Sequence, residues 1–114
     1  MEEYQKIKEN LVQEFRRGIL VYVVLLNCNE SIYGYSLVGK LEKSGIPIEK
    51  NTLYPLLRRL EKQGLLSSDW NTKESRPRKY YILTELGNKV LNELRIEWAD
   101  LNNKLNLIIE GESK

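Results

Sequence analysis

The chain has 114 residues, of which 41% are hydrophobic and 30% are charged. This length and composition indicate one small domain with a modest core. The sequence has no histidine and a single cysteine, which argues against a zinc site and against histidine-based acid–base chemistry. The seven glycines are scattered and form no phosphate-binding loop. We therefore expect no enzyme activity, no metal and no cofactor.

The single cysteine and the longest apolar run indicate a cytoplasmic protein without a membrane partner. Cys28 has no second cysteine for a disulfide and no activating neighbour in its segment LLNCNE, so we interpret it as a structural thiol at a helix end. No secretory signal pattern is recognisable. The longest apolar run, residues 18–26, is shorter than the roughly 18 residues of a membrane span.

Positive charge is concentrated in the middle of the chain. Residues 15–83 hold twelve Lys and Arg against six Asp and Glu, a net charge of +6, whereas residues 1–14 and 84–114 each have a net charge of −2. A solvated surface explains such a pattern by itself. The local patterns within this segment decide whether it has a binding role.

Helical spacing predicts a first helix from Glu3 to Leu26. Its apolar residues recur every three to four positions at Ile7, Leu11, Phe15, Ile19, Tyr22 and Leu26. The first half is the more charged, so Tyr4, Ile7 and Leu11 are predicted to face another subunit.

A second helix is predicted from Ser31, as N-cap, to Leu41 or Ser44. Gly45 and Pro47 then stop it. Within it Tyr33 and Tyr35 fit packing as well as DNA contact, so both interpretations stay open.

The third predicted helix begins at Asn51 or Thr52 as N-cap, accommodates Pro55 in or beside its first turn, and ends at Gln63-Gly64. One face is apolar, and the other is basic and aromatic. The apolar face comprises Leu53, Leu56, Leu57 and Leu60, and the polar face comprises Lys50, Tyr54, Arg58, Arg59 and Lys62. A basic, aromatic face on a short helix is typical of a DNA reader that enters the major groove.

Two strands are predicted after this helix, Leu65–Asn71 and Lys79–Leu83, joined by a polar turn over Thr72–Arg78. Four cations crowd the turn: Lys73, Arg76, Arg78 and Lys79. A basic hairpin beside a basic helix fits a wing that follows the phosphate backbone.

Three segments resemble the PadR family of bacterial transcription regulators. They are Tyr33-Gly34-Tyr35, the run from Asn51 to Leu65 (NTLYPLLRRLEKQGL), and the run from Arg78 to Gly87 (RKYYILTELG). The resemblance spans about residues 15–98.

This resemblance implies a dimeric winged-helix repressor whose third helix enters the major groove. Carried over by position, Tyr33, Thr52, Tyr54 and Arg58 match the family's DNA-facing part, and Arg78 and Lys79 match the basic end of its wing. The short chain resembles members with a single C-terminal helix. The family's usual Gly-Arg-Arg appears here as Arg76-Pro77-Arg78, a departure that affects the wing conformation.

The last helix is predicted from Thr84, as N-cap, to about Ile109. Its apolar residues form a seam of the coiled-coil kind at Val90, Leu94, Trp98, Leu101, Leu105 and Ile108. So small a domain cannot bury this seam alone, so we predict a homodimer that holds two readers about one DNA turn apart, roughly 34 Å.

Trp98 is a candidate for ligand binding as well as for packing. It lies fourteen residues after Thr84, and the resemblance implies that a tryptophan at this distance lines a pore at the dimer interface and stacks on planar aromatic effectors. Packing is the commoner role of a tryptophan at a seam. Asp100, and Phe15 and Ile19 from the first helix of the other subunit, are the predicted neighbours.

The predicted fold is therefore mainly α with a small β-hairpin: a winged helix-turn-helix over residues 1–84 and a dimerisation helix over residues 85–114. The predicted function is a dimeric repressor of a twofold operator, and its predicted DNA contacts include Asn51 and Thr52 besides the cations named. A winged-helix module that binds proteins instead of DNA, and a small-molecule carrier that uses the dimer pore, are the alternatives.

Overall fold

A computed structural model describes residues 1–73 and 75–112. Its elements in chain order are α1 (Glu2–Leu26), β1 (Ile32–Tyr33), α2 (Gly34–Lys43), α3 (Lys50–Lys62), β2 (Leu66–Asn71), β3 (Arg78–Leu83) and α4 (Glu85–Glu112). The predicted mainly helical fold with a hairpin is confirmed. Within the described residues, no helix is long and apolar enough to cross a membrane.

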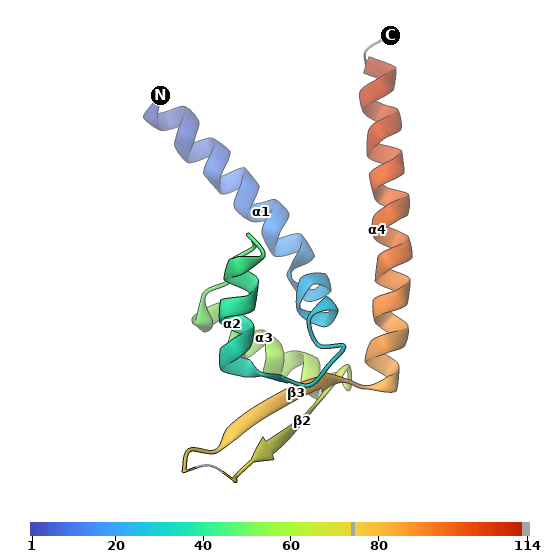
Figure 1. Ribbon diagram of the computed structural model, residues 1–114. Coiled ribbons are helices and arrows are strands. Elements are labelled where there is room, and N and C mark those ends of the chain that lie inside the picture. The colour runs from blue at the N-terminus through green and yellow to red at the C-terminus, as the bar shows by residue number, and fades with distance from the viewer. Residues whose placement is uncertain (74, 113–114) are drawn as a thin grey trace.

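The helices and the sheet enclose one core at the centre of the molecule. It is formed by apolar residues of all four helices and the sheet, including Leu25, Leu37, Leu57, Tyr81 and Leu91. From this core α1 and α4 diverge on one side, and the β2–β3 hairpin projects on the other (Figure 1). The molecule measures 62 × 37 × 22 Å, and both the N-terminus and the outer end of α4 lie far from the hairpin (Figure 1).

The sheet has three strands in the order β1-β3-β2, and both pairings are antiparallel. The strand β1 was not predicted, and the prediction that Ser31 caps the second helix is wrong. Ile32 and Tyr33 pair with Tyr81 and Tyr80 of β3, so the chain is still extended there and α2 begins only at Gly34.

The start of α3 also differs from the prediction. The backbone carbonyl of Glu49 accepts hydrogen bonds from the N–H groups of Thr52 and Leu53 at 3.0 and 2.9 Å, and no side chain caps the helix. Asn51 and Thr52 therefore lie inside the first turn. Pro55 falls in the second turn, on an exposed side of the helix, where water can satisfy the carbonyl that its missing N–H leaves unpaired.

The predicted N-cap of the last helix is confirmed. Thr84 Oγ1 accepts a hydrogen bond from the Gly87 N–H at 2.9 Å and donates to the Gly64 carbonyl at 2.6 Å. The backbone N–H of Thr84 donates to the Leu65 carbonyl at 3.1 Å. Thr84 thus both caps α4 and joins it to the end of α3.

Candidate nucleic-acid interface

The predicted reading helix exposes its basic side and buries its apolar side. Leu53, Leu56, Leu57 and Leu60 are buried, which fixes the rotation of α3 against the core. Arg58, Arg59 and Lys62 are exposed, as are Asn51 and Thr52 at the N-terminal end. The burial of four leucines thus presents a continuous polar face to a partner.

An aromatic cluster with two cations lies beside the start of α3. The ring of Tyr33 lies 6.0 Å from that of Tyr35 and 5.7 Å from that of Tyr80. The Arg78 guanidinium lies 5.2 Å from the Tyr33 ring centre, and the Lys50 ammonium lies 4.8 Å from that of Tyr35. Cation–π contacts of this kind restrict the positions of the two charges. One cation from β3 and one from α3 are therefore held within the same tyrosine cluster.

Tyr54 connects α3 to this cluster. A Cβ on Gly34 would lie 3.6 Å from Tyr54 Cε1 and 3.3 Å from Tyr81 Cε2, so the absence of a side chain at Gly34 gives both rings their space. Burial raises the pKa of the Tyr54 hydroxyl, and the phenol groups of Tyr33, Tyr35 and Tyr81 raise it further. Tyr54 therefore stays protonated and can donate a hydrogen bond to a phosphate or a base.

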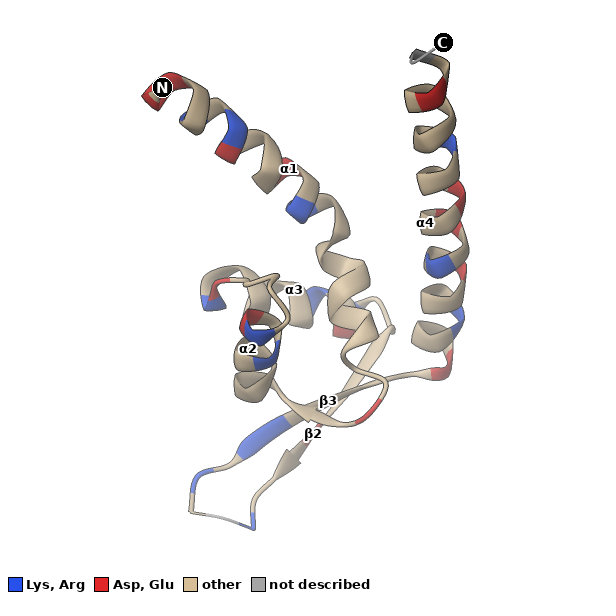
Figure 2. Cartoon of the chain, turned by 45° about the horizontal axis from the view of Figure 1, so that its top comes forward, with Lys and Arg blue, Asp and Glu red and all other residues tan. Residues whose placement is uncertain are grey.

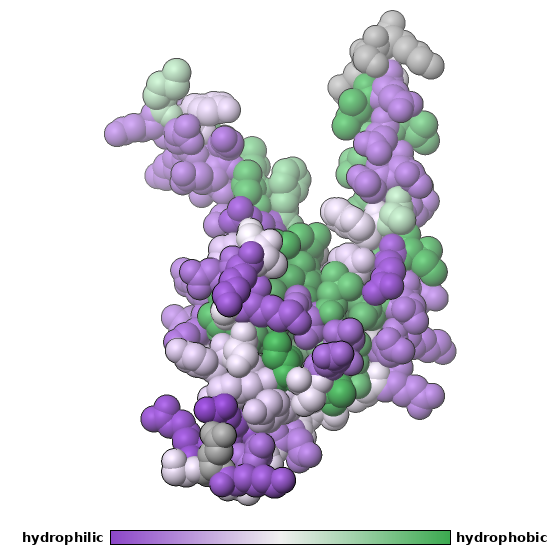
Figure 3. Space-filling model, viewed as in Figure 1, coloured by the Kyte–Doolittle hydropathy of each residue, from purple (hydrophilic) through white to green (hydrophobic). Residues whose placement is uncertain are grey.

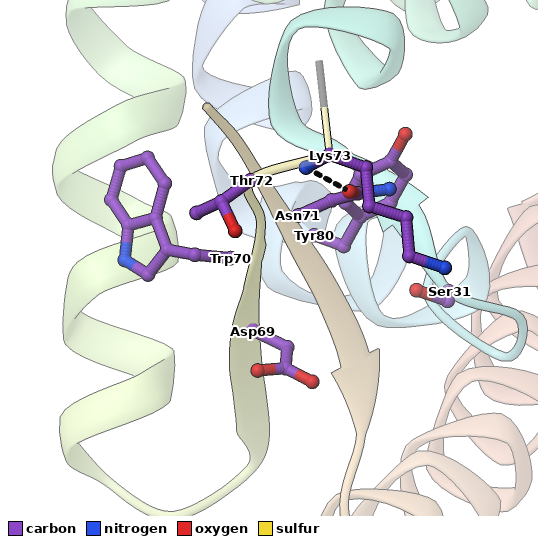
Figure 4. Close-up of a pocket in the computed structure, with 7 residues that line it drawn as sticks. All are labelled: Ser31, Asp69, Trp70, Asn71, Thr72, Lys73 and Tyr80. Carbon is purple, nitrogen blue, oxygen red and sulfur yellow. Dashed lines mark hydrogen bonds between the residues drawn. The ribbon is translucent and has the colours of Figure 1, made fainter. Parts of the chain in front are cut away.

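The β2–β3 hairpin, here called the wing, extends its basic tip into solvent. Lys73 and Arg76 are exposed, and the Lys73 backbone N–H donates to Asn71 Oδ1 at 3.0 Å, the dashed line in Figure 4. Among the described residues only Gly45 and Gly64 have a positive φ. The wing at Pro77 therefore uses a backbone conformation that proline can adopt, and glycine is not needed there.

The two faces of the wing differ. Figure 4 shows the Trp70 indole pointing to one side of the hairpin, and Asp69 and Lys73 to the other. A shallow pocket of about 550 Å³ lies here, lined by Ser31, Asp69, Trp70, Asn71, Thr72, Lys73 and Tyr80. Its lining contains both a carboxylate and an ammonium group, so the pocket does not present charge of one sign that would bind an ion.

Of the predicted phosphate contacts, Lys79 has its charge engaged within the chain. Its Nζ lies 3.4 Å from Glu61 Oε1, and it also lies 5.3 Å from the Tyr81 ring centre and 5.9 Å from that of Trp70. The remaining Lys and Arg of this half of the molecule spread over α2, α3 and the wing, whereas α4 carries both signs (Figure 2). The positive surface thus coincides with the reading helix and the wing.

Three of the four predicted ligand-site residues lie together between α1 and α4 of one chain. A cavity of about 270 Å³ is lined by Ile19, Trp98 and Asp100, and by Gly18, Tyr22, Leu94, Glu97, Leu101 and Lys104. The Asp100 carboxylate pairs with the Lys104 ammonium at 2.9 Å. Phe15 does not line this cavity, and 75% of its surface is exposed.

The predicted dimer residues divide into two groups. Val90 and Leu94 are half-buried and pack on the core of their own chain. Further from the core the seam is exposed at Trp98, Leu101, Leu105 and Ile108, as are Ile7 and Leu11 on α1. Figure 3 shows apolar side chains gathered where α1 and α4 diverge and again along the outer part of α4.

Comparison with known proteins identifies the family. The model of the transcriptional regulator PadR-like family matches residues 23–93. The chain belongs to this family. Its members are transcription regulators, which agrees with the function class that the resemblance implied.

Individual relatives of this PadR-like regulator support the assignment over most of its length. The crystal structure of a PadR family regulator from Eggerthella lenta is 48% identical, covers 96% of this chain and 98% of its own, and has a TM-score of 0.92. The transcriptional regulator Rv3488 of Mycobacterium tuberculosis is 32% identical over 74% of this chain and 79% of its own. A PadR-like regulator from Bacillus cereus is 29% identical over 84% of this chain and 96% of its own, with a TM-score of 0.76.

Several residues at this interface of the PadR-like regulator were not identified from the sequence. Tyr80 contributes a ring to the cluster around Tyr33, but a tyrosine in a strand carries no local signal of such stacking. Glu61 and Ser68, which contact each other between α3 and the wing, are seven residues apart. The capping-box pattern and other local motifs do not cover such pairs.

Proposed function

We propose that this PadR-like regulator is a homodimeric repressor of a twofold operator. In this proposal α3 enters the major groove with Tyr54 and Arg58, and the tip of the wing follows the backbone with Lys73 and Arg76. Residues 1–84 form the DNA-binding part, and residues 85–114 form the dimerisation helix. The observation that carries the proposal is the coincidence of the positive charge with the exposed faces of α3 and the wing.

The arrangement of charged and apolar surfaces supports this division of labour. Lysine and arginine side chains near phosphates release counterions and supply sequence-independent affinity, whereas side chains on α3 can reach base edges in the groove. Most of the large exposed apolar residues lie on α1 and α4, and those on the outer parts of these helices are at the other end of the molecule (Figure 3). Soluble proteins rarely leave such faces uncovered, and a second copy would bury them by a twofold contact.

Binding to duplex DNA at several salt concentrations tests the proposal. The probe is an operator selected by the wild-type protein from a random-sequence duplex library, with a shuffled duplex of equal length for comparison. We expect Arg58→Ala to lower operator affinity at least about tenfold, since one base or phosphate contact is lost in each subunit. The slope of log affinity against log salt should become shallower if Arg58 contacts a phosphate.

Lys89→Ala is the matched control, because Lys89 is exposed on α4, outside α3 and the wing, and its loss removes the same charge. It should leave operator affinity within about twofold of wild type. If the library yields no enriched sequence at low salt, the DNA-binding proposal fails. If Arg58→Ala and Arg78→Ala also leave the protein's cellular activity unchanged, the winged-helix protein-interaction module becomes the better explanation.

A second proposal concerns an effector of the same dimer. The cavity beside Trp98 places an indole next to the apolar side chains of Ile19, Tyr22 and Leu101, a lining that suits a planar aromatic molecule. In the Trp70→Phe background Trp98 is the remaining tryptophan, so its fluorescence reports the cavity alone. We expect quenching by planar aromatic compounds and, at the same concentrations, release of the operator. No quenching across a broad panel would assign Trp98 to packing.

A further inference from the structure

Glu61 is the one acidic residue of α3 and occupies its last turn, between Arg59 and Lys62. A carboxylate is unfavourable there for two reasons. The C-terminal end of a helix carries partial negative charge, and in the proposed complex the nearby phosphates would repel it. Its presence in the reading helix therefore calls for a specific role.

Its carboxylate contacts both strands of the wing. Oε1 lies 3.4 Å from the Nζ of Lys79 on β3, and Oε2 accepts a hydrogen bond from the Ser68 hydroxyl on β2. The two side chains of the ion pair are only 33% and 28% exposed. One residue of the reading helix thus holds each strand of the hairpin through a separate oxygen.

These contacts add to the packing that joins the base of the hairpin to the core, where Leu66 and Tyr81 are buried and β3 pairs with β1. After α3 the chain passes through Gly64, whose φ of +83° is the conformation in which a glycine turn redirects the chain. The strands pair with each other in a defined register, Ser68 opposite Tyr81 and Trp70 opposite Lys79. Contacts with Glu61 therefore act on the hairpin as one unit and, together with this packing, set its angle to α3.

We propose that Glu61 is a positioning residue for DNA recognition, an inference that rests on the proposed DNA binding. It holds the wing at the angle at which the groove contacts of α3 and the backbone contacts of the wing are made together. It also keeps the Lys79 ammonium away from phosphates, which lowers affinity for arbitrary sequences. Lys79 then acts through its ion pair with Glu61, here called the latch, and not as a direct phosphate contact.

Glu61→Gln tests this inference because the two side chains have nearly the same shape. Operator affinity should fall about three- to tenfold, the range expected when one partner of a partly exposed, charge-assisted contact is lost. Affinity for the shuffled duplex should rise, and its salt slope should steepen by about 1.8 for the dimer, about 0.9 for each subunit, because the released lysine of each subunit gains a phosphate. The ratio of operator affinity to shuffled-duplex affinity therefore falls, because the first decreases and the second increases.

Lys79→Met and Asp69→Asn complete the set. Lys79→Met should lower operator affinity as Glu61→Gln does, leave the salt slope unchanged, and add little when the two are combined, since both break one contact. Asp69 is exposed on the opposite face of the wing (Figure 4). Its substitution removes the same charge as Glu61→Gln, and it should raise both affinities alike and leave their ratio unchanged.

A readout without DNA separates the latch from the proposed function. In the Trp98→Phe background Trp70 is the remaining tryptophan, and the Lys79 ammonium lies 5.9 Å from its ring. Glu61→Gln should shift the Trp70 emission maximum, whereas Asp69→Asn should leave it unchanged. If the wild type fails to select an operator, the proposed function fails, and Trp70 emission still decides whether the latch holds Lys79.

Two results would overturn the inference. If Glu61→Gln preserves the affinity ratio, Glu61 is an ordinary surface charge, whatever its effect on the melting temperature. If Lys79→Met lowers both affinities alike and makes the salt slope shallower by about 1.8 for the dimer, about 0.9 for each subunit, Lys79 contacts a phosphate directly.

Discussion

Gly87→Ala perturbs the glycine whose absent side chain leaves the least room in the structure. Gly87 lies in the first turn of α4, and a Cβ built on it would lie 2.0 Å from the Leu65 carbonyl oxygen and 2.9 Å from the Leu65 carbonyl carbon. Both are backbone atoms, so no side chain can rotate away. To accept the methyl group, α4 must move away from the end of α3 by more than about 1 Å.

The expected cost follows from the contacts that this movement breaks. Forcing a methyl group into a packed site costs about 1–3 kcal/mol. The Thr84 hydrogen bonds to Gly64 and Leu65 would lengthen as well, at about 1 kcal/mol each. Alanine recovers about 1 kcal/mol because it favours a helix more than glycine does. We therefore expect Gly87→Ala to lower the free energy of unfolding by about 3 kcal/mol.

Urea denaturation followed by far-UV circular dichroism measures this change, at equal protomer concentration because dimer formation would shift the midpoint. Gly39→Ala is the matched control, since Gly39 lies in α2 and a Cβ there would meet nothing within 4 Å. It should stabilise the protein by about 0.5–1 kcal/mol. If Gly87→Ala is as stable as Gly39→Ala, the close approach of α4 to Leu65 does not exist in solution.

Two further predictions concern the N-cap hydroxyl of Thr84 and the buried thiol of Cys28. Thr84→Val keeps the shape of the N-cap but removes its hydroxyl, so the free energy of unfolding should fall by about 1–2 kcal/mol; the same urea titration measures it, and an unchanged midpoint would mean that the cap contributes nothing. Burial raises the pKa of the Cys28 thiol from 9.0 to about 11, and Lys40 opposes the shift. The folded chain therefore keeps its proton where the unfolded chain loses it. The protonated thiol therefore makes its full contribution to the free energy of unfolding below pH 9. About 3 kcal/mol of that contribution is lost as the pH rises from 9 to 11. Urea titrations of wild type and Cys28→Ala across this range should show the difference between them shrinking by that amount, and a constant difference would contradict the buried thiol.

The long elements were predictable because their periodicity is local. The apolar spacing of α1 and α4 continues over many turns, and both predicted helices agree with the structure within a few residues. Both strands of the wing were predicted within one residue for a related reason, since the polar turn between them separates two runs rich in strand formers. Thr84 was recognisable as a cap because a helical pattern begins directly after it.

The failures occur where tertiary contacts decide the local structure. Ser31 has the chemistry of an N-cap, but Ile32 and Tyr33 gain more by pairing with β3, which delays the start of α2 by two residues. A two-residue strand carries no periodicity that a single sequence can show. Likewise, the latch between Glu61 and Lys79 joins residues 18 positions apart, and nothing near either residue indicates it.

The joint at Thr84 gives the proposed dimer a mechanical property. α4 spans 28 residues, about 42 Å at 1.5 Å per residue, so a tilt of about 5° at its base moves the far end by about 4 Å. The cavity beside Trp98 lies between α1 and the middle of α4, where an inserted molecule would act on this lever. Because Thr84 holds the base of α4 against Gly64 and Leu65, a tilt of α4 must carry the end of α3 with it. The distance between the two reading helices of the dimer would then change with the occupancy of the cavity. Operator affinity would fall as this distance departs from the spacing of the two half-sites.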